Sequence, residues 1–255
     1  MTVRAKKELG QHFLVDENIL RVIGRLAELE PDDVVLEIGP GKGMLTRFLA
    51  ERVAVVHAVE VDRSLAPHLP ADERVRVHFG DALRLDLAAL EPPPGKFVSN
   101  LPYNVATPLV AESLAGLQSV ERWCVMVQRE VADRFFAAPS TKAYGAVSVV
   151  VQLAAERTGF HPVSRDVFRP RPNVDSALVA FRRRGALPHD WPRLRRVVDA
   201  AFAHRRKTLP NSLQLAGVAD RERAAAALEA IGRDASTRAE ALAPEEFVAL
   251  ADVLG

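Results

Sequence analysis

The 255-residue sequence lacks several features that mark common protein classes. It contains a single cysteine, Cys124, so no disulfide can form within the chain and a disulfide-stabilised secreted domain is excluded. No apolar run reaches the length of a membrane-spanning helix, and residues 1–7 lack the apolar core of a signal peptide. The seven histidines show no metal-ligand spacing, so no metal is expected. We therefore expect a cytoplasmic protein without a membrane partner.

A large net charge is also absent, because the formal net charge is only +1. The basic residues are unevenly distributed, however. Residues 165–207 contain twelve Arg or Lys against four Asp or Glu, whereas residues 208–255 contain four against eight. Such a cluster is typical of phosphate binding, and we expect Arg205, Arg206 and Lys207 to contact a nucleic acid backbone. The alternative is a solvated surface, since arginine outnumbers lysine 28 to 6 and this bias produces arginine clusters by itself.

The strongest fold signal is an apolar strand followed by a glycine loop and a helix. Residues 33–38 form the strand, residues 39–43 (Gly-Pro-Gly-Lys-Gly) the loop, and residues 44–53 continue with helical spacing. This order is typical of a nucleotide-binding α/β unit, in which Gly39 and Gly41 let the backbone approach a ligand. The glycines follow the spacing G-x-G-x-G. This differs from the G-x-G-x-x-G spacing of loops that cradle a pyrophosphate. A ligand without a pyrophosphate is therefore favoured.

Acidic residues follow the next strands of this unit. The strand at residues 54–59 ends at Glu60, about 20 residues beyond the first glycine, where an acid commonly binds ribose hydroxyls. The strand at residues 76–79 is followed by Asp81, which is placed to accept from an adenine amino group. Each acid alone is typical of a solvated surface or a helix cap. Together with Glu37 they predict an acidic crevice that suits the cationic sulfonium of S-adenosylmethionine.

A fourth strand, residues 96–99, leads into the tetrapeptide Asn100-Leu101-Pro102-Tyr103. The Asn100 side-chain oxygen and the Leu101 carbonyl are suited to accept the two hydrogens of an adenine amino group. Pro102 restricts Leu101 to extended geometry, and Tyr103 offers a face on which a base stacks. The alternative is an ordinary turn at the end of a strand. In a doubly wound sheet the first and fourth strands flank the switch point, which predicts that the glycine loop lies beside this tetrapeptide.

The whole chain is predicted to be an α/β protein with a Rossmann-like sheet, mostly parallel with an antiparallel last strand, plus a small helical domain at the C-terminus. We place the domain boundary between residues 1–186 and residues 187–255. The remaining expected elements are a helix capped by Asp16 and running to Leu29, a buried fifth strand around Cys124, a helix at 144–156, two strands at 157–162 and 174–181, and helices from Trp191 onward.

Several segments of the sequence resemble the ribosomal RNA adenine dimethylases, and the match runs from about Lys7 to Arg183. They are Leu9-Gly10-Gln11-His12-Phe13-Leu14, Glu37 to Gly43, Glu60-Val61-Asp62, Gly80-Asp81-Ala82, Asn100 to Tyr103, Tyr144 to Ser148, and Phe168 to Ser176. The resemblance is greatest to the small-subunit branch of the family. It implies transfer of methyl groups from S-adenosylmethionine to N6 of two adjacent adenosines near the 3′ end of 16S rRNA, in a precursor of the 30S particle. Nothing in the sequence demands more than a monomer, and a monomer is expected.

The resemblance implies roles for individual residues as well. Cofactor contacts are implied for His12, Leu14, Gly39, Glu60, Asp81 and Asn100. Tyr103 and Phe168 are implied to sandwich the target base, although Phe168 also fits a hydrophobic plug for its own loop. The family usually has asparagine where this chain has His12, and the charge of histidine depends on pH, so we expect weaker cofactor binding at low pH.

Three other functions share most of these features. A 23S rRNA adenine methylase of the macrolide-resistance type has the same sheet domain and most of the motifs. A ribosome assembly or transcription factor would keep the fold without the chemistry, and a DNA adenine methylase would use the same donor. The acids and the tetrapeptide favour an active enzyme, and the resemblance alone favours rRNA.

Overall fold

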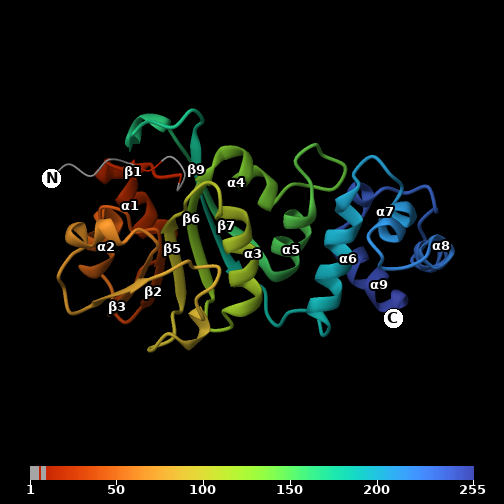
Figure 1. Cartoon of the computed structure of the whole chain (residues 1–255), viewed down its shortest axis with the longest axis horizontal. Helices are drawn as coiled ribbons and strands as arrows, with labels where there is room; N and C mark the ends of the chain where they lie inside the picture. The colour runs from red at the N-terminus through yellow and green to blue at the C-terminus, as the bar shows by residue number, and fades with distance from the viewer. Residues whose placement is uncertain (1–5, 7–9) are drawn as a thin grey trace. The chain divides into compact units, whose positions relative to one another are not determined.

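The computed structural model describes residue 6 and residues 10–255, which form two compact units. Lys7 and Leu9, at the start of the resemblance, lie outside the described residues. The first unit holds the described residues up to Ala132 together with Glu156–Arg183, and the second holds Asp133–Ala155 and Arg184–Gly255 (Figure 1). Residues 133–155 thus group with the C-terminal helices, whereas the sequence-based boundary places them in residues 1–186.

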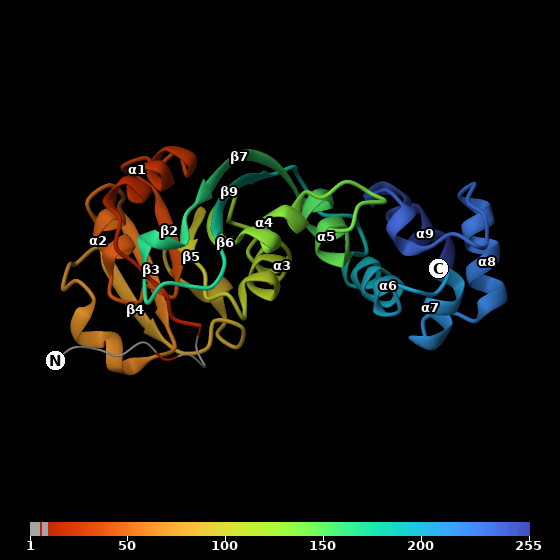
Figure 2. The ribbon, with the colours of Figure 1, turned by 90° about the horizontal axis from the view of Figure 1, so that it is seen from above.

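The first unit is built on a seven-stranded sheet with the order β4-β3-β2-β5-β6-β9-β7 (Figure 2). The strands are β2 (Val34–Ile38), β3 (Val55–Glu60), β4 (Val75–Phe79), β5 (Lys96–Asn100), β6 (Arg122–Gln128), β7 (Ala155–Val163) and β9 (Ser176–Arg183). The pairs from β4 to β6 are parallel, and β9 is antiparallel to β6. The predicted sheet is confirmed. The strand order reverses between β2 and β5, which makes this pair the switch point.

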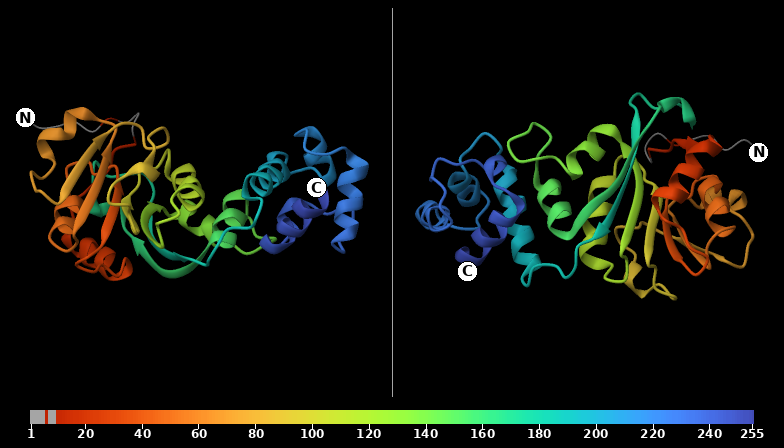
Figure 3. Two further views of the ribbon diagram at one scale, coloured as in Figure 1. Left: turned by 90° about the horizontal axis from the view of Figure 1, so that it is seen from below. Right: turned by 180° about the vertical axis from the view of Figure 1, so that it is seen from behind.

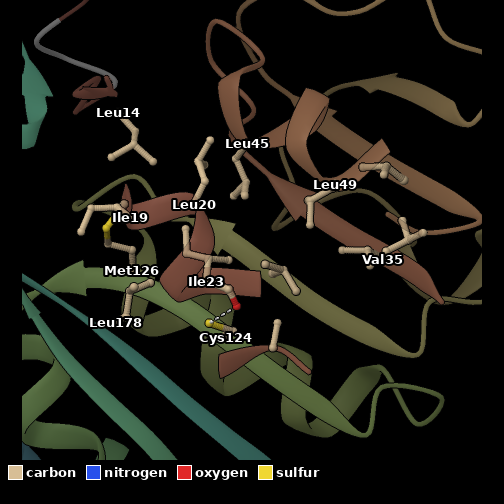
Figure 4. Packing of buried hydrophobic residues seen from close by; sticks show 14 of the residues in the cluster. Leu14, Ile19, Leu20, Ile23, Val35, Leu45, Leu49, Cys124, Met126 and Leu178 are labelled. Carbon is tan, nitrogen blue, oxygen red and sulfur yellow. Dashed lines mark hydrogen bonds between the residues drawn. The ribbon is translucent and has the colours of Figure 1, made fainter. Parts of the chain in front are cut away.

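Helices α1 (Glu17–Leu26) and α2 (Met44–Ala50) cover one face of the sheet (Figure 4). Ile23 and Leu49 belong to the hydrophobic cluster on this face together with Cys124, which is buried as predicted. Asp16 caps α1, since its side chain accepts the N–H of Asn18. The helix ends before the predicted Leu29 because the backbone becomes left-handed at Glu28, with φ at 47°.

Helix α3 (Ala106–Gly116) covers the opposite face. The Trp123 Nε1–H donates to Ser113 Oγ at 2.9 Å, and the Trp123 ring stacks on Phe181 with centroids 5.4 Å apart. Arg183 lies over the Trp123 ring and donates to backbone carbonyls of α3 and of the following loop. This arginine of the basic cluster is therefore part of the packing of the sheet.

Short elements complete the first unit. Strand β1 (Phe13–Leu14) pairs antiparallel with β8 (Phe168–Arg169) and joins the N-terminal segment to the loop before β9. Helix α4 (Arg129–Phe135) follows β6 and continues past Ala132 into the second unit, and 3-10 turns occur at Arg63–His68, Leu87–Ala89 and Arg165–Val167.

The second unit is helical, as Figure 3 shows for the green-to-blue end of the chain. Its helices are α5 (Ala146–Ala154), α6 (Trp191–Ala203), α7 (Leu209–Leu215), α8 (Arg221–Ala230) and α9 (Pro244–Leu254), with a 3-10 turn at Ala239–Ala241. The Phe202 ring contacts the rings of Tyr144 and Phe247 in this unit, and the Tyr144 hydroxyl donates to the Leu242 carbonyl at 2.8 Å. This packing explains why residues 133–155 belong to the unit. Within the described part of the chain, no helix has the length and apolar character needed to cross a membrane.

Candidate active site

The pleat of three strands directs polar side chains to one edge of the sheet. Residues that are two or four positions apart in a strand point to the same face of the sheet. On each strand a core residue on the face covered by α1 and α2 is followed at such a spacing by a polar residue. These pairs are Val35 and Glu37, Val56 and Glu60, and Val98 and Asn100. All three polar residues lie at or beside the carboxyl end of a parallel strand, where ligands of open α/β sheets bind.

A serine joins the two strands at the switch point. The register of β2 and β5 covers only Val35↔Lys96 and Leu36↔Phe97. Beyond it, the Ile38 N–H donates to Ser99 Oγ at 3.1 Å and the Ser99 hydroxyl donates to the Ile38 carbonyl. Ser99 thereby replaces the missing ladder. No role was expected for Ser99 from the sequence, although a polar residue after the apolar pair Phe97-Val98 is a usable signal.

The strand ends surround a cavity of about 280 Å³. Every residue predicted to bind the cofactor or to act on the amino group lines it: His12, Leu14, Gly39, Gly41, Glu60, Asp81, Asn100, Leu101, Pro102 and Tyr103. The glycine loop and the tetrapeptide lie against each other, because a Cβ on Gly39 would come within 3.2 Å of the Pro102 ring. The structure therefore brings the two main sequence signals together in one place.

Gly41 lets the backbone of the loop pack tightly beside the cavity. Its φ of 59° is left-handed, and a Cβ there would lie 2.9 Å from the Phe13 ring. The Gly41 N–H donates to Glu60 Oε2 at 3.1 Å. A side chain at position 41 would thus displace both the aromatic wall of the cavity and an N–H donor to the acid.

Glu60 and Asp62 form the acidic side of the cavity and its border. The second oxygen of Glu60 accepts the Asp62 N–H at 2.9 Å, and burial raises the pKa of the Glu60 carboxyl. Asp62 accepts from Lys6 at 2.8 Å and from Gln11 at 3.2 Å, which ties the N-terminal segment to the end of β3. Burial raises the pKa of Asp62, but the hydrogen bonds from Lys6, Ser64 and Gln11 outweigh it and hold that pKa well below its usual range.

Glu37 is the least satisfied acid in the cavity. Its residue is 1% exposed, and its Oε2 has no hydrogen-bond partner among the described residues. Burial raises the pKa of this carboxyl to about 8; the Thr46 hydroxyl lowers it in part, and the Glu60 carboxylate adds to the increase. A buried carboxyl with a free oxygen suits a ligand that carries a positive charge or a hydrogen-bond donor.

Asn100 and Tyr103 are held in defined orientations. The Asn100 Nδ2 donates to the His12 carbonyl at 3.2 Å, which leaves the side-chain oxygen as an acceptor for a ligand. The Tyr103 hydroxyl shares a hydrogen bond of 2.6 Å with Ser176 Oγ. The His12 ring stacks on Tyr103 with centroids 5.3 Å apart, and its Nδ1 lies 2.8 Å from the Pro170 carbonyl oxygen. A base that stacks on Tyr103 must use the other face of the ring or displace His12.

Asp81 lies at the opposite end of the cavity lining and is half exposed. One of its carboxylate oxygens accepts the Leu83 N–H at 3.0 Å, and the other lies 3.5 Å from Arg84 Nε. Asp81 thus reaches the cavity from the loop that follows β4.

Phe168 does not line this cavity. Its side chain is fully buried in the hydrophobic core with Leu14 and Ile19, because the pairing Leu14↔Phe168 turns the ring inward. A sandwich of Tyr103 and Phe168 is therefore not present in this conformation, and the reading of Phe168 as a hydrophobic plug fits its surroundings.

The three basic residues predicted to bind RNA lie in the second unit, directly after α6. All are exposed. Arg205 donates to the Tyr144 carbonyl at 2.9 Å and lies 3.9 Å from Glu240, so it also stabilises its own unit. Arg206 and Lys207 form no ion pair with any residue in the described part of the chain, and their charges face solvent.

Comparisons with known sequences agree on one family. A sequence model described as "Ribosomal RNA adenine dimethylase" matches residues 2–254. "Ribosomal RNA small subunit methyltransferase A" of Rubrobacter xylanophilus is 50% identical over 253 residues, which cover 98% of this chain and 95% of that protein. The protein of the same name from Thermosynechococcus vestitus is 43% identical over 264 residues, covering 99% and 97%.

Solved structures show the same fold. A dimethyladenosine transferase from Plasmodium falciparum superposes with a TM-score of 0.77 at 22% identity, covering 94% of this chain and 96% of that one. The 23S rRNA methyltransferase ErmE superposes with a TM-score of 0.64 at 30% identity, covering 95% and 99%. Both likenesses extend over the sheet and the helical C-terminal part.

Proposed function

Because the chain belongs to the ribosomal RNA adenine dimethylase family, we propose that it transfers methyl groups from S-adenosylmethionine to N6 of two adjacent adenosines near the 3′ end of 16S rRNA. The product is N6,N6-dimethyladenosine, made in a precursor of the 30S particle. Two bacterial proteins named for the small ribosomal subunit are 43% and 50% identical to this chain over nearly its whole length, which supports this substrate. An rRNA substrate also favours a cytoplasmic location, and nothing in the proposed reaction requires more than a monomer.

One observation carries the proposal: the glycine loop and the Asn100–Tyr103 tetrapeptide line the same cavity. A donor held by the loop and an amino group held by the tetrapeptide would then be close enough for direct transfer. Bringing the two reactants together in this way removes much of the entropic barrier to the reaction. The Ser99 bridge between β2 and β5 supports this proximity, since it fixes the two strand ends relative to each other.

The residues of the cavity fit S-adenosylmethionine. We assign the ribose hydroxyls to Glu60, the adenine amino group to Asp81, and the cationic part of the donor to the side of the cavity where Glu37 has a free oxygen. Gly39 and Gly41 keep the loop free of side chains so that the ligand can approach the backbone. His12 and Leu14 close the cavity from the N-terminal segment. The donor supplies an electrophilic methyl group when it is bound.

Asn100 and Leu101 act on the target adenine. The lone pair of N6 is delocalised into the ring, so N6 is a poor nucleophile until its hydrogens are held by acceptors. The Asn100 side-chain oxygen and the Leu101 carbonyl accept these hydrogens and stabilise the positive charge that develops on nitrogen. The methylated nitrogen then loses a proton to water, so no strong base is required.

Tyr103 receives the base after it leaves its stack in the RNA. Extrusion costs a few kcal/mol, which stacking on an aromatic ring offsets. The hydrogen bond to Ser176 keeps the Tyr103 ring in place for this contact. Arg206 and Lys207 contribute binding to RNA phosphates, because their exposed charges are available for counterion release.

The experiment is incubation of 30S particles that lack the modification with labelled S-adenosylmethionine, followed by nucleoside analysis. We expect two residues of N6,N6-dimethyladenosine per particle, mapped by primer extension to adjacent positions near the 3′ end of 16S rRNA. Absence of label from 16S rRNA, with the protein folded and able to bind the cofactor, would refute the substrate.

A second candidate is a 23S rRNA methyltransferase, which the likeness to ErmE at 30% identity favours. The same assay on 50S particles and on free 23S rRNA separates the two. Label in 23S rRNA and none in 16S rRNA would establish this alternative.

A further inference from the structure

Two buried carboxyl groups line the same cavity but have different surroundings. Both oxygens of Glu60 accept backbone N–H groups, from Gly41 at 3.1 Å and from Asp62 at 2.9 Å. Backbone N–H groups can only donate, so this arrangement stabilises Glu60 as an anion. Glu37 has an oxygen without any partner among the described residues and is 1% exposed. When two neighbouring carboxyl groups repel each other, ionising both is unfavourable. The carboxyl group with fewer hydrogen-bond donors then keeps its proton, and here that group is Glu37.

The charged groups around Glu37 do not change this assignment. Glu60 on β3 repels a second negative charge. Arg47 on α2 attracts one, but its guanidinium already donates to the carbonyls of Lys42 at 2.8 Å and His68 at 3.0 Å and remains exposed. Glu37 therefore has no committed cationic partner in the protein itself.

We propose that the carboxyl of Glu37 is protonated in the ligand-free protein and releases its proton when a cationic ligand enters the cavity, so that binding of the methyl donor is coupled to proton release. The proposal rests on the proposed function, which supplies a donor with a sulfonium and an ammonium group. Either cation can take the place of the proton. After transfer the sulfonium becomes an uncharged thioether, so one of the two charges that favour the ionised carboxyl is lost.

The test counts the protons released on binding by titration calorimetry at pH 7 in two buffers of different ionisation enthalpy. Three ligands are compared: S-adenosylmethionine carries both cations, S-adenosylhomocysteine carries only the ammonium, and 5′-methylthioadenosine carries neither. With the Glu37 pKa raised to about 8, we expect roughly 0.9 proton to be released with the donor and almost none with methylthioadenosine. The value for S-adenosylhomocysteine then identifies which cation is responsible, since full release assigns the ammonium and reduced release assigns the sulfonium.

The sign of the pH dependence follows from the same linkage. The donor binds to the ionised Glu37 carboxyl. Below a pH of about 8 this carboxyl is mostly protonated in the ligand-free protein, so its proton must be removed before the donor binds. The Kd of the donor should therefore rise roughly tenfold from pH 7 to pH 6 and become nearly constant above pH 8. This measurement uses the unmodified protein and does not depend on the folding of any variant.

Two variants and one control locate the effect. Glu37→Gln should abolish the proton release and flatten the pH dependence of Kd, while Glu73→Gln, an exposed glutamate before β4, should change neither. His12→Asn removes the imidazole of the cavity lining, which separates the expected effect of His12 at low pH from that of Glu37, and should leave the release at pH 7 intact. Donor binding without proton release, or release that disappears in His12→Asn and persists in Glu37→Gln, would overturn the proposal. Failure of all three ligands to bind the folded protein would instead overturn the proposed cofactor site.

Discussion

Replacing Ser99 with alanine should separate the positioning of the site from the stability of the sheet. The hydroxyl of this serine, on a residue that is 1% exposed, both accepts the Ile38 N–H and donates to the Ile38 carbonyl. Its loss leaves two buried backbone groups without a partner, each costing about 1–3 kcal/mol. We expect the free energy of unfolding to fall by roughly 2–6 kcal/mol.

The same change should impair the reaction more than this loss of stability explains. Ser99 is the side chain that holds the end of β2, which carries the glycine loop, against the end of β5, which carries Asn100. A displacement of about 1 Å between reacting groups can cost 10²-fold in rate, so we expect a fall in kcat of about this size under conditions where the variant is folded. Urea denaturation measures the free energy of unfolding, and calorimetric titration measures the affinity for the cofactor. A single-turnover methylation assay measures the rate of transfer.

Ser113→Ala provides a matched control. Ser113 is 5% exposed and accepts the Trp123 Nε1–H at 2.9 Å on the opposite face of the same sheet. Its removal also leaves a buried donor unsatisfied, at a cost of about 1–3 kcal/mol, but Ser113 is not part of the cavity lining. Equal kcat values in the two variants would refute the reasoning, because Ser99 would then contribute only stability.

Three further substitutions test individual roles. Asn100→Ala should lower kcat about 10²–10³-fold with cofactor affinity within about threefold of wild type; near-normal dimethyladenosine yield would exclude its role in activating the amino group. Gly41→Ala should weaken cofactor binding at least tenfold, since the new Cβ meets the Phe13 ring at 2.9 Å and the residue must keep a φ of 59°; an unchanged titration would contradict this. The double variant Arg206→Ala, Lys207→Ala should preserve cofactor binding and reduce the salt dependence of rRNA binding by a slope of roughly 1.5, and an unchanged slope would remove these residues from the RNA contact.

The parts of the site that depend on period and topology could be predicted from the sequence. Apolar runs of four to six residues followed by glycines or acids place Gly39, Glu60 and Asp81 at the ends of strands, and the reversal of strand order then places Asn100 beside the loop. Each of these steps needs only the alternation of a strand and the connection rules of parallel sheets. For this reason every residue assigned to the cofactor or to the amino group lines the cavity, whereas Phe168 does not.

The orientation of side chains on short, irregular segments could not be predicted in this way. Phe168 lies on a two-residue strand whose direction is set by pairing with Leu14, a residue more than 150 positions earlier. Shifting such a register by one residue would move the ring to the other side, and no local pattern specifies which side is chosen. The boundary predicted from the sequence left residues 133–155 outside the helical unit for a related reason. These residues join that unit through contacts such as that of the Tyr144 ring with Phe202, which lies far away in the sequence.

The surroundings of the acids show why identity alone does not define a role. Glu37 and Glu60 are the same residue type on adjacent parallel strands, two residues apart in the register, since Glu37 pairs with Ala58. Glu60 lies at the last position of its strand, where the turn that follows offers the Asp62 N–H and the glycine loop offers the Gly41 N–H. Glu37 lies within its strand, where the backbone N–H groups are committed to the ladder and none is available to its side chain. Position along the strand thus makes Glu60 a stable anion suited to ribose hydroxyls, and makes Glu37 the acid whose charge depends on what enters the cavity.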